Sequence, residues 1–407
     1  MKKKIINDPV YGFITITNEL IYEIISHPNF QRLRHIKQLG LTDFVYPAAL
    51  HTRFQHALGA MHLMGKVLDT LRLKGIEVSD DEYEASQLAI LLHDVGHGPF
   101  SHTLEDSILP GIKHESLSYL FMERLNKEFK GALDLAIKIF RNSYKRKFFH
   151  QLVSSQLDID RLDYLKRDCF FTGVQEGTIG VDRIVSMLTV HQNSLVVEEK
   201  GIYSIESFLN ARRLMYWQVY LHKTTVSTER MLVNLMRRAQ ALIRAGEPLV
   251  ASDSLLPFLQ KDYVLADFSD DPDILQYYGK LDDNDIWGAL KFWINDHDPI
   301  LSLLATMIIE RKLFQIRLSA EPIKKNQVED IQVAITKKYG LLRAEAKYLF
   351  SHGTVTNEAY AEGQEINVLM KGGEVLDLAQ ASDLPNIKAI SKIVKKNYLC
   401  WPKTVSL

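Results

Sequence analysis

Apolar residues recur at three- and four-residue steps along most of residues 20–244, which is the period of an amphipathic helix. Three stretches show this pattern most clearly: SQLAILLHDV (86–95), ESLSYLFMERL (115–125) and ERMLVNLMRRAQALI (229–243). Short breaks rich in glycine and proline, at 96–99 and 109–111, separate the segments. The pattern predicts a large, mainly helical first part of the chain.

One stretch within this part interrupts the helical period. Residues 189–205, TVHQNSLVVEEKGIYSI, hold two apolar runs that flank Lys200-Gly201. Two such runs around a glycine turn are typical of a β-hairpin. We expect a small hairpin here, with its turn at Lys200-Gly201.

Beyond residues 245–254 the pattern changes. Residues 255–320 still read as helical, including LSLLATMIIERKLFQIRL (301–318). Residues 328–340 predict another helix, and 365–379 predict a strand, a Gly-Gly turn and a second strand. Residues 386–399 fit a late helix or a strand equally well.

These elements predict a mainly α fold with two parts. We expect a helical domain over residues 1–250, whose motif-bearing core covers about 50–170, and a smaller C-terminal subdomain over 251–407 that is first helical and then α+β. A chain of 407 residues is long enough for both.

Composition narrows the class of protein. The chain has 49 Lys and Arg against 50 Asp and Glu, so its surface is not built as a whole for nucleic acid. Cys169 and Cys400 are too few for a disulfide framework, which favours a reducing compartment. The basic start has no apolar run behind it, and no stretch approaches the roughly 20 apolar residues that span a bilayer. We expect a cytoplasmic protein without a membrane anchor.

Candidate metal ligands gather around LLHDVGHGPFSH (91–102). A divalent metal bound by imidazole and carboxylate needs three or four such groups from different elements. The chain offers His56, the adjacent His93 and Asp94, and Asp160. Adjacent residues on a helix point about 100° apart, so His93 and Asp94 can share an ion only at a helix end, which the break at 96–99 supplies.

Any one histidine is more often a packing residue than a ligand, but five of them stand in similar helical surroundings, each beside a carboxylate, an arginine or a glycine: His56, His93, His97, His102 and His114. A second pattern lies at 160–168, where Asp160, Asp163, Tyr164, Arg167 and Asp168 form one continuous helical face. Such a stripe is as often the solvated side of a helix as a functional face.

Several blocks resemble the HD-domain metal-dependent phosphohydrolases. His56, His93-Asp94 and Asp160 match the H…HD…D signature of that family. NDPVYGFITI, FQRLRHIKQLG, HTRFQHALG, LLHDVGHGPFSH, HES and IDRLDYLKRDC are similar to its deoxynucleoside triphosphate (dNTP) triphosphohydrolase branch. These blocks extend from Asn7 to about Lys223, more than half of the chain, and the segment KGGEVLDLAQASDL resembles the branch more loosely.

The resemblance implies a reaction in which water attacks the α-phosphorus of a dNTP and releases a deoxynucleoside and inorganic triphosphate. It implies a metal held by His56, His93, Asp94 and Asp160, which would polarise a phosphate oxygen and activate water. Mixed nitrogen and oxygen ligands suit Fe, Mn, Co, Ni or Zn, with additional Mg²⁺ on the substrate phosphates. The choice among these metals is open.

The resemblance also implies the catalytic groups. His102 matches the catalytic histidine, as proton donor to the leaving oxygen or as a group that orients the nucleophile. His114 and Glu105 match its supporting relay, although the family often has aspartate where this chain has Glu105. His97 and Glu115 would complete the pocket.

Further matches concern the substrate. Arg53, Arg161, Arg212 and Tyr220 match phosphate contacts, with Arg161 in place of a common lysine. Tyr164 would pack against the deoxyribose and leave little room for a 2′-hydroxyl. Asp168 would accept a hydrogen bond from the 3′-hydroxyl, with Gln38 beside it.

Members of this branch form dimers and tetramers, and some bind a nucleotide effector between subunits. We therefore expect a homodimer or homotetramer. Six residues match effector contacts: Lys4, Asn7, Gln31, Arg34, Lys223 and Arg311. Ser26 stands where a human member has an aspartate that reads guanine, so we expect altered or relaxed base selectivity.

Two other functions remain open. One is an HD-type nucleotidase or phosphodiesterase acting on another nucleotide, since the fold alone does not set the substrate. The other is a nucleic-acid-binding protein with a vestigial site, for which YKRKFFH (144–150) is the best basic and aromatic patch.

Overall fold

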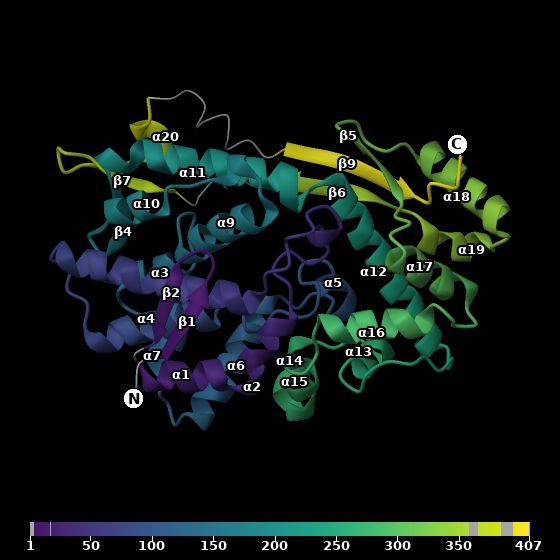
Figure 1. The fold of residues 1–407 in the computed structure, drawn as a ribbon, viewed down its shortest axis with the longest axis horizontal. Coiled ribbons are helices and arrows are strands. Elements are labelled where there is room, and N and C mark those ends of the chain that lie inside the picture. Colours follow the sequence, from purple (N-terminus) through teal and green to yellow (C-terminus); the bar gives the residue numbers. More distant parts are fainter. Residues whose placement is uncertain (1–3, 17, 358–364, 384–393, 407) are drawn as a thin grey trace.

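The computed structural model describes residues 4–16, 18–357, 365–383 and 394–406. Over these residues the chain is mainly helical, which confirms the predicted fold class (Figure 1). It opens with an antiparallel hairpin of β1 (Lys4–Asp8) and β2 (Gly12–Ile16), whose inner residues pack on the helical core. Three short helical segments follow: α1 (Glu19–Ser26), α2 (Pro28–Gln31) and η1 (Arg32–His35).

The centre of the first part is α3 (Arg53–Leu73), which packs against α4 (Asp80–Leu92) on one side and α9 (Ile159–Thr172) on another. Helix α3 carries an almost continuous set of buried residues, because neighbours cover it on several faces. The smaller helices complete this bundle: η2 (Thr42–Phe44), α5 (Glu105–Ile108), α6 (His114–Glu128), α7 (Asp134–Phe140), α8 (Lys147–Val153), η3 (Gln175–Gly177) and α10 (Val181–Met187).

The predicted hairpin is present, but its turn lies elsewhere. Strands β3 (Leu188–His191) and β4 (Ser194–Glu198) pair antiparallel, and they turn at Gln192-Asn193, where both residues have positive φ. The predicted turn at Lys200-Gly201 is wrong, because these residues end the short helix η4 (Glu199–Gly201). Two residues in the left-handed region suit a tight hairpin turn, and asparagine tolerates that conformation better than most residues.

Two helices follow the hairpin. Helix α11 (Ile202–Met215) runs into η5 (Tyr216–Tyr220), a single turn of π-helix. Helix α12 (Lys223–Arg244) then packs against elements of the C-terminal part, above all α13 (Leu256–Gln260) and α17 (Pro299–Ile309). The division of the chain after residue 250 stays a prediction.

The C-terminal part begins with helices, as predicted. Helices α14 (Leu265–Asp270), α15 (Pro272–Tyr278) and α16 (Asp283–Trp293) precede α17. The prediction of a helix throughout 301–318 is wrong at its end, since residues 315–319 form β5 (Gln315–Ser319). The alternating, partly buried side chains of FQIRL suit an edge strand, and the helical period ends at Ile309.

Two small sheets complete the fold. Strand β9 (Val394–Trp401) lies between β5 and β6 (Ser351–Asn357), so the part of 386–399 that the structure describes is a strand. The predicted strand–turn–strand is confirmed as β7 (Asn367–Leu369) and β8 (Val375–Asp377), and β7 pairs in parallel with β4 of the first part. The predicted helix over 328–340 is α18 (Lys325–Tyr339), and α19 (Arg343–Ala346), η6 (Lys347–Leu349) and α20 (Leu378–Ala381) are short.

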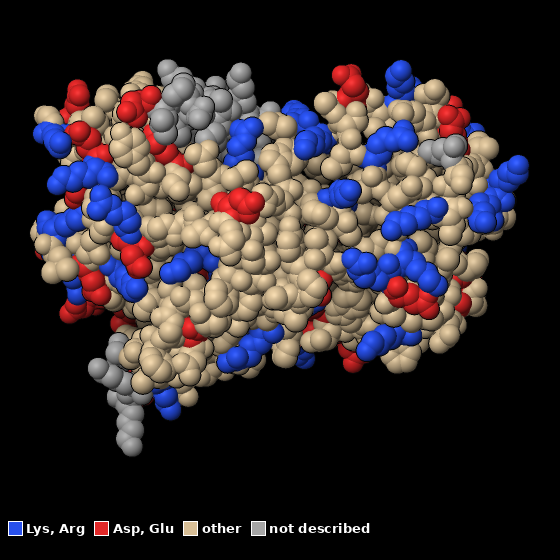
Figure 2. Space-filling view, turned by 45° about the horizontal axis from the view of Figure 1, so that its top comes forward, with Lys and Arg blue, Asp and Glu red and all other residues tan. Residues whose placement is uncertain are grey.

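None of the described helices combines the length and apolar character that a bilayer span requires. The basic patch at 144–150 is largely engaged in packing. Tyr144 and Arg146 hydrogen-bond to Glu82, and Phe148 and Phe149 are fully buried. On the face shown in Figure 2, positive and negative side chains are interspersed rather than gathered into one basic surface.

Candidate active site

The first predicted metal ligand, His56, lies in the first turn of α3. Thr52 starts the helix, and its backbone N–H donates to Gln55 Oε1 across 2.8 Å, which satisfies one free group of the helix end. Arg53 is tied to the preceding segment through its own N–H, which donates to the carbonyl of Ile36. His56 is completely buried, so its ring is directed into the bundle rather than to solvent.

His93 and Asp94 lie at the end of α4, where the pair was predicted to be. The helix ends at Leu92, and His93 is its C-cap. His93 Nδ1 lies 2.6 Å from the carbonyl oxygen of Ile90, to which it donates, so Nε2 is the nitrogen that faces the interior. This backbone contact fixes the ring orientation, because a metal-binding histidine is commonly held by a hydrogen bond from its other ring nitrogen.

Asp160 comes from the first turn of α9. The N-cap of this helix is Asp158, whose carboxylate accepts the backbone N–H of Arg161 across 2.8 Å. The polar stripe of 160–168 is not the solvated side of the helix. Asp163, Arg167 and Asp168 are each at most 1% exposed, which indicates a functional or structural network.

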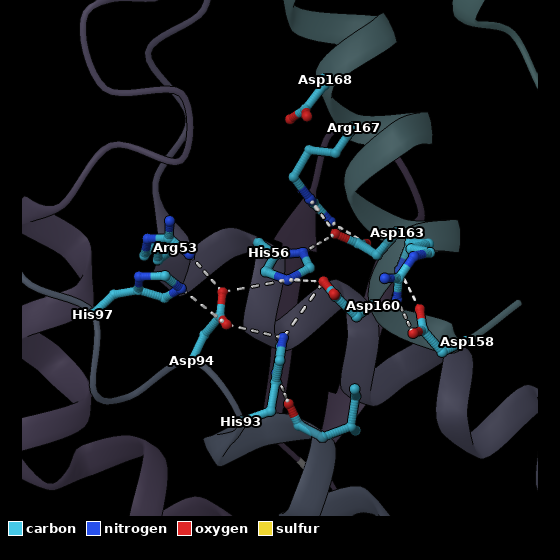
Figure 3. Close-up of polar contacts among 12 residues, drawn as sticks. Arg53, His56, His93, Asp94, His97, Asp158, Asp160, Asp163, Arg167 and Asp168 are labelled. Atoms are coloured by element: carbon cyan, nitrogen blue, oxygen red, sulfur yellow. Dashed lines mark hydrogen bonds and ion pairs between the residues drawn. The ribbon is translucent and has the colours of Figure 1, made fainter. Parts of the chain in front are cut away.

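These three elements bring the four predicted ligands together (Figure 3). His56 Nε2 lies 3.1 Å from Asp160 Oδ1 and 3.8 Å from Asp94 Oδ2. His93 Nε2 lies 3.2 Å from Asp94 Oδ1 and 3.5 Å from Asp160 Oδ1. Such separations are those of groups arranged around one central ion, and His56, His93 and Asp160 form a group whose ligand atoms all lie within 4.8 Å.

The donor set fits a divalent transition metal. His56 Nε2 and His93 Nε2 are both buried and have no hydrogen-bond partner among the described residues, although both lie against carboxylates. Burial opposes a charge on His56, but Asp160 and Asp163 raise its pKa from 6.5 to about 10. The pocket thus strongly favours positive charge, and an ion with two imidazole and two carboxylate ligands would satisfy it.

A second layer of contacts holds His56, and it was not predicted as part of the site. His56 Nδ1 lies 2.8 Å from Asp163 Oδ2. Arg167 forms a bidentate ion pair with the Asp163 carboxylate, in which Nε donates to Oδ2 and Nη2 donates to Oδ1, each across 3.0 Å. Arg167 also donates to Asp8 at the end of β1, across 2.7 Å. The sequence feature that could have indicated this network is the polar stripe at 160–168. Asp163 and Arg167 are four residues apart in it, so they lie on the same face of the helix.

Arg53 and His97 lie on the other side of Asp94. Arg53 Nη1 donates to Asp94 Oδ2 across 2.6 Å, and His97 Nε2 lies 3.3 Å from Asp94 Oδ1. Burial and the positive charge of Arg53 hold the pKa of His97 well below 6.5. His97 is therefore neutral at physiological pH, and Arg53 supplies the positive charge at this edge of the site.

The predicted proton-transfer residues form a cluster beside this edge. The rings of His97 and His114 stack with centroids 3.8 Å apart, and His102 approaches both edge-on. Glu105 Oε1 accepts the backbone N–H of His114 across 2.7 Å and lies 3.2 Å from its Nδ1. Glu105 Oε2 lies 3.8 Å from His102 Nδ1. Glu105 therefore lies close to both His102 and His114, although the similar family often has an aspartate at this position.

The exposure of His102 and Glu115 shows which part of this cluster a ligand from solvent can contact. The side chain of His102 is 67% exposed, so it can meet a ligand that enters from solvent. Glu115 contacts His114 at 3.6 Å, but its side chain is 59% exposed, so it lies at the rim rather than inside the pocket.

Two further arginines come from α9 and α11. Arg161 forms an ion pair with Asp158, and Arg212 Nη1 donates to Gln156 Oε1 across 2.8 Å. Arg212 is 3% exposed. Burial is unfavourable for the guanidinium of Arg161, but Asp158 and neighbouring acidic groups raise its pKa above its usual value. Arg161 therefore remains a cation. Burial raises the pKa of Tyr164, and the nearby guanidinium groups of Arg212 and Arg161 oppose that rise.

Asp168 is the centre of a separate group eight residues along α9 from Asp160. Its Oδ1 lies 2.7 Å from His51 Nε2, and its Oδ2 accepts the hydroxyl of Tyr220 across 2.8 Å. Tyr164 meets the Tyr220 ring edge-on, with centroids 6.2 Å apart. Tyr220, predicted to contact phosphate, is therefore held at Asp168. His51 was not predicted here, although it stands in the HTRFQH block.

Gln38 lies beside the Asp168 group, whereas the predicted effector residues lie on several separate elements. The Gln38 N–H donates to the His51 carbonyl across 2.9 Å, which puts its backbone beside the Asp168 group. The effector residues are spread over several elements: Lys4 and Asn7 in β1, Gln31 in α2, Arg34 in η1, Lys223 at the start of α12 and Arg311 after α17. Arg311 donates to the carbonyl of Phe44 in η2, and the guanidinium of Arg34 lies over the Phe54 ring.

Comparisons with known proteins agree with this geometry. The HD-domain family model matches residues 53–168, which include all four candidate ligands, and the model of an HD-associated region matches residues 179–253. The uncharacterized protein YwfO of Bacillus subtilis is 30% identical over 99% of this chain and 93% of its own length. A crystal structure of a phosphohydrolase from Bacteroides thetaiotaomicron is 51% identical, with a TM-score of 0.95 over 99% of this chain and 100% of that one. The chain belongs to the HD-domain phosphohydrolases.

Some relatives carry a named activity. A Dictyostelium discoideum homolog of the deoxynucleoside triphosphate triphosphohydrolase SAMHD1 is 30% identical over 62% of this chain and 54% of its own length. Human SAMHD1 is 28% identical over 59% of this chain and 45% of its own length. This chain therefore spans about half the length of these two relatives.

Proposed function

We propose that this protein hydrolyses deoxynucleoside triphosphates to a deoxynucleoside and inorganic triphosphate. The observation that carries the proposal is a set of three arginines around the candidate site: Arg53 pairs with Asp94, and Arg161 and Arg212 lie close to Tyr164. Arg53, Arg161 and Arg212 come from three helices, and the Nε of each is buried without a hydrogen-bond partner among the described residues. Unused, buried Nε donors on three guanidinium groups suit a ligand with several phosphates.

The similarity to SAMHD1 and its Dictyostelium homolog supports the same substrate class, since both are named as dNTP triphosphohydrolases. The HD-domain match covers residues 53–168, which include the four candidate ligands. An HD-type nucleotidase acting on a monophosphate would need fewer cations, so the three arginines favour the triphosphate.

We assign His56, His93, Asp94 and Asp160 as ligands of one divalent transition metal. When bound, such an ion supplies Lewis acidity to a phosphate oxygen and lowers the pKa of water. Asp163 and the Ile90 carbonyl orient the two imidazole rings by their contacts to Nδ1. Two imidazole and two carboxylate ligands suit Fe, Mn, Co, Ni or Zn.

We assign proton transfer to the exposed histidine of the neighbouring cluster. Desolvation by the surrounding protein, together with Arg53 and His114, lowers the pKa of His102 to about 4, so its ring is neutral before substrate binds. It would accept a proton from the attacking water and pass that proton to the departing 5′-oxygen. Glu105 lies within reach of both His102 and His114, and so it would hold the two rings in a productive orientation and stabilise the imidazolium form. His97, kept neutral by burial and Arg53, can accept or donate a hydrogen bond without adding charge.

We assign Asp168 and Tyr164 to the sugar. Asp168 is held by His51 and Tyr220 on its two oxygens, and it would accept the 3′-hydroxyl through a remaining lone pair. Tyr164 would lie against C2′ and exclude a 2′-hydroxyl, and Gln38 would border the same end. This arrangement predicts faster hydrolysis of dNTPs than of ribonucleotides.

The test is an analysis of products in water enriched in oxygen-18. Each dNTP and each ribonucleoside triphosphate is incubated with metal-supplemented protein, and the phosphorus products are separated and weighed by mass spectrometry. The proposal predicts triphosphate carrying one labelled oxygen and an unlabelled deoxynucleoside. Release of orthophosphate or pyrophosphate, or equal rates on ribonucleotides, contradicts it.

We also propose that the protein works as a homodimer or homotetramer with a nucleotide effector between subunits. The support is the match of Lys4, Asn7, Gln31, Arg34, Lys223 and Arg311 to effector contacts in the similar branch. Ser26, at the end of α1, lacks the carboxylate that would select guanine. Rates measured with pairs of dNTPs test this proposal: activation of one substrate by another supports it, and rates that are hyperbolic and independent of the mixture contradict it.

A further inference from the structure

The segment that carries the candidate proton donor has an unfavourable backbone. We call residues 96–103 the catalytic loop, on the basis of the proposed function. Phe100 has φ 47° and His102 has φ 64°, and neither is a glycine. Non-glycine residues adopt the left-handed region rarely, and they persist there only where the surroundings hold them. The loop therefore needs contacts that fix it from outside.

One carboxylate from the C-terminal part supplies such contacts. Asp283, the first residue of α16, is 3% exposed. Its Oδ1 accepts the backbone N–H of Phe100 across 2.9 Å, and its Oδ2 accepts the backbone N–H of Lys37 across 2.9 Å. The side chain thus joins the catalytic loop to the segment before α3.

The second segment borders the other end of the site. The carbonyl of Ile36 accepts the N–H of Arg53, and the N–H of Gln38 donates to the His51 carbonyl. Lys37 lies between these two residues. Fixing Lys37 therefore fixes the segment to which Arg53 and His51 are both hydrogen-bonded.

Neighbouring residues of the C-terminal part reinforce this contact. The hydroxyl of Tyr278 donates to the Gly96 carbonyl across 3.0 Å, and a Cβ on Gly98 would lie only 2.6 Å from that hydroxyl oxygen. Arg32 is buried between the Phe121 and Tyr278 rings, and it donates to the carbonyls of Val95 and Leu281. The back of the catalytic loop is thus packed against residues 278–283.

We infer that Asp283 is a positioning residue for the proposed reaction, because its carboxylate holds the Phe100 and Lys37 N–H groups and so sets the catalytic loop against the segment that anchors Arg53. Asp283 lies outside both matched family regions, 53–168 and 179–253. The C-terminal part therefore completes the active site, even though it supplies none of the groups assigned to metal, phosphate or sugar.

The main test is Asp283→Asn, which keeps the shape of the side chain and one carbonyl oxygen. The amide nitrogen then faces a backbone N–H, so one of the two contacts is lost. We expect the amides of residues 96–103 to exchange with deuterium at least about tenfold faster, because their restraint is lost. We expect kcat to fall about 10- to 100-fold with KM within about twofold, since the loop is misplaced rather than the phosphate contacts. Metal content per chain should not change.

Asp298→Asn is the matched control. Asp298 is also a buried carboxylate at a helix start, and it accepts the Leu301 N–H and pairs with Arg238, away from the catalytic loop. We expect it to lower stability while leaving kcat and loop exchange unchanged. If Asp283→Asn does not fold, Tyr278→Phe removes the contact to Gly96 alone and should speed exchange in the same loop.

Two outcomes would overturn the inference: unchanged loop exchange and kcat in Asp283→Asn, or uniformly faster exchange across the chain with the same loss of kcat in Asp298→Asn. The exchange measurement needs no substrate. If the wild-type protein fails to hydrolyse dNTPs, the proposed function fails while the structural role of Asp283 is still tested.

Discussion

Asp163 Oδ2 lies 2.8 Å from His56 Nδ1, on the side of the ring opposite the candidate metal position. The contact leaves His56 Nε2 directed at Asp160, 3.1 Å away. A carboxylate behind a metal-binding imidazole fixes its orientation and raises its basicity as a ligand. Asp163 therefore acts through His56, although it offers no ligand of its own.

Replacing Asp163 with asparagine should weaken metal binding. An amide can still accept a hydrogen bond from His56 Nδ1, but it lacks the negative charge that makes the imidazole a strong ligand. We expect metal affinity to fall about 10- to 100-fold, as is typical when such partners are changed. Metal content after dialysis against a graded chelator, measured by inductively coupled plasma mass spectrometry, checks this.

Asp8→Asn is the control for that variant. Asp8 pairs with Arg167, the second partner of Asp163, but it has no contact with His56. The control should lose stability and keep its metal. Equal loss of metal from both variants would show that the network acts only through folding.

The pair of His51 and Asp168 predicts a test of sugar recognition. In His51→Phe the ring still stacks on Phe171, but the hydrogen bond to Asp168 is lost. Hydrogen bonds to charged groups contribute about 1.5–3 kcal/mol, so kcat/KM for dNTPs should fall about 10- to 100-fold. A 2′,3′-dideoxy substrate has no 3′-hydroxyl to place, and its kcat/KM should change little.

Phe171→Leu serves as its comparison, since it removes the stacking and keeps the hydrogen bond. This variant should affect both substrates mildly and alike. If His51→Phe lowers hydrolysis of the deoxy and dideoxy substrates equally, Asp168 does not act on the 3′-hydroxyl.

Arg212 provides a test of phosphate binding. Arg212→Gln keeps a donor near Gln156 but removes the buried positive charge. Charge-assisted contacts to phosphate are about twice as strong as neutral ones, so we expect KM to rise about tenfold or more, with a smaller change in kcat. Steady-state kinetics with one dNTP checks this, and an unchanged KM would place the triphosphate elsewhere.

Glu82 links stability to pH. Burial raises the pKa of its carboxyl, but hydrogen bonds from Tyr144, Ser79 and Arg146 outweigh that effect and lower it below the ordinary value. A lowered pKa gives stability above the unfolded value of about 4.3, and that stability is lost as the pH falls through the folded value. Glu82→Gln should therefore cost about 1.5–3 kcal/mol of unfolding free energy at pH 7 and much less near pH 3.

Urea unfolding at several pH values measures this difference. Asp80→Asn, which alters a salt bridge of a 98% exposed carboxylate with Arg72, should have little effect at any pH. A cost for Glu82→Gln that is the same at pH 3 and pH 7 would contradict the assignment.

The sequence was sufficient to predict the helical class and the four residues that converge. Periodicity marks α4, α6 and α12 because each buries an apolar face, and the break at 96–99 correctly placed His93 and Asp94 at a helix end. The hairpin of β3 and β4 was also visible. Its turn was misplaced because a Lys-Gly pair is a stronger local signal than Gln192-Asn193.

Contacts between distant residues could not be predicted in this way. Asp283 reaches Phe100 across 183 residues and Lys37 across 246, and nothing in its local pattern distinguishes it from Asp282 or Asp285. His51 meets Asp168 across 117 residues. Such pairs depend on how helices pack, and a helical period indicates only which face is buried. The stripe at 160–168 was ambiguous for the same reason.

The central claim is that His56, His93, Asp94 and Asp160 share one ion, and anomalous diffraction tests it most directly. Crystals of protein supplied with Mn, Fe, Co, Ni or Zn are measured at the absorption edge of that metal. The account predicts one strong anomalous peak at about 2.0–2.2 Å from both imidazole Nε2 atoms and from an oxygen of each carboxylate. A peak bound elsewhere, or a fully supplemented crystal with none at these residues, would contradict it.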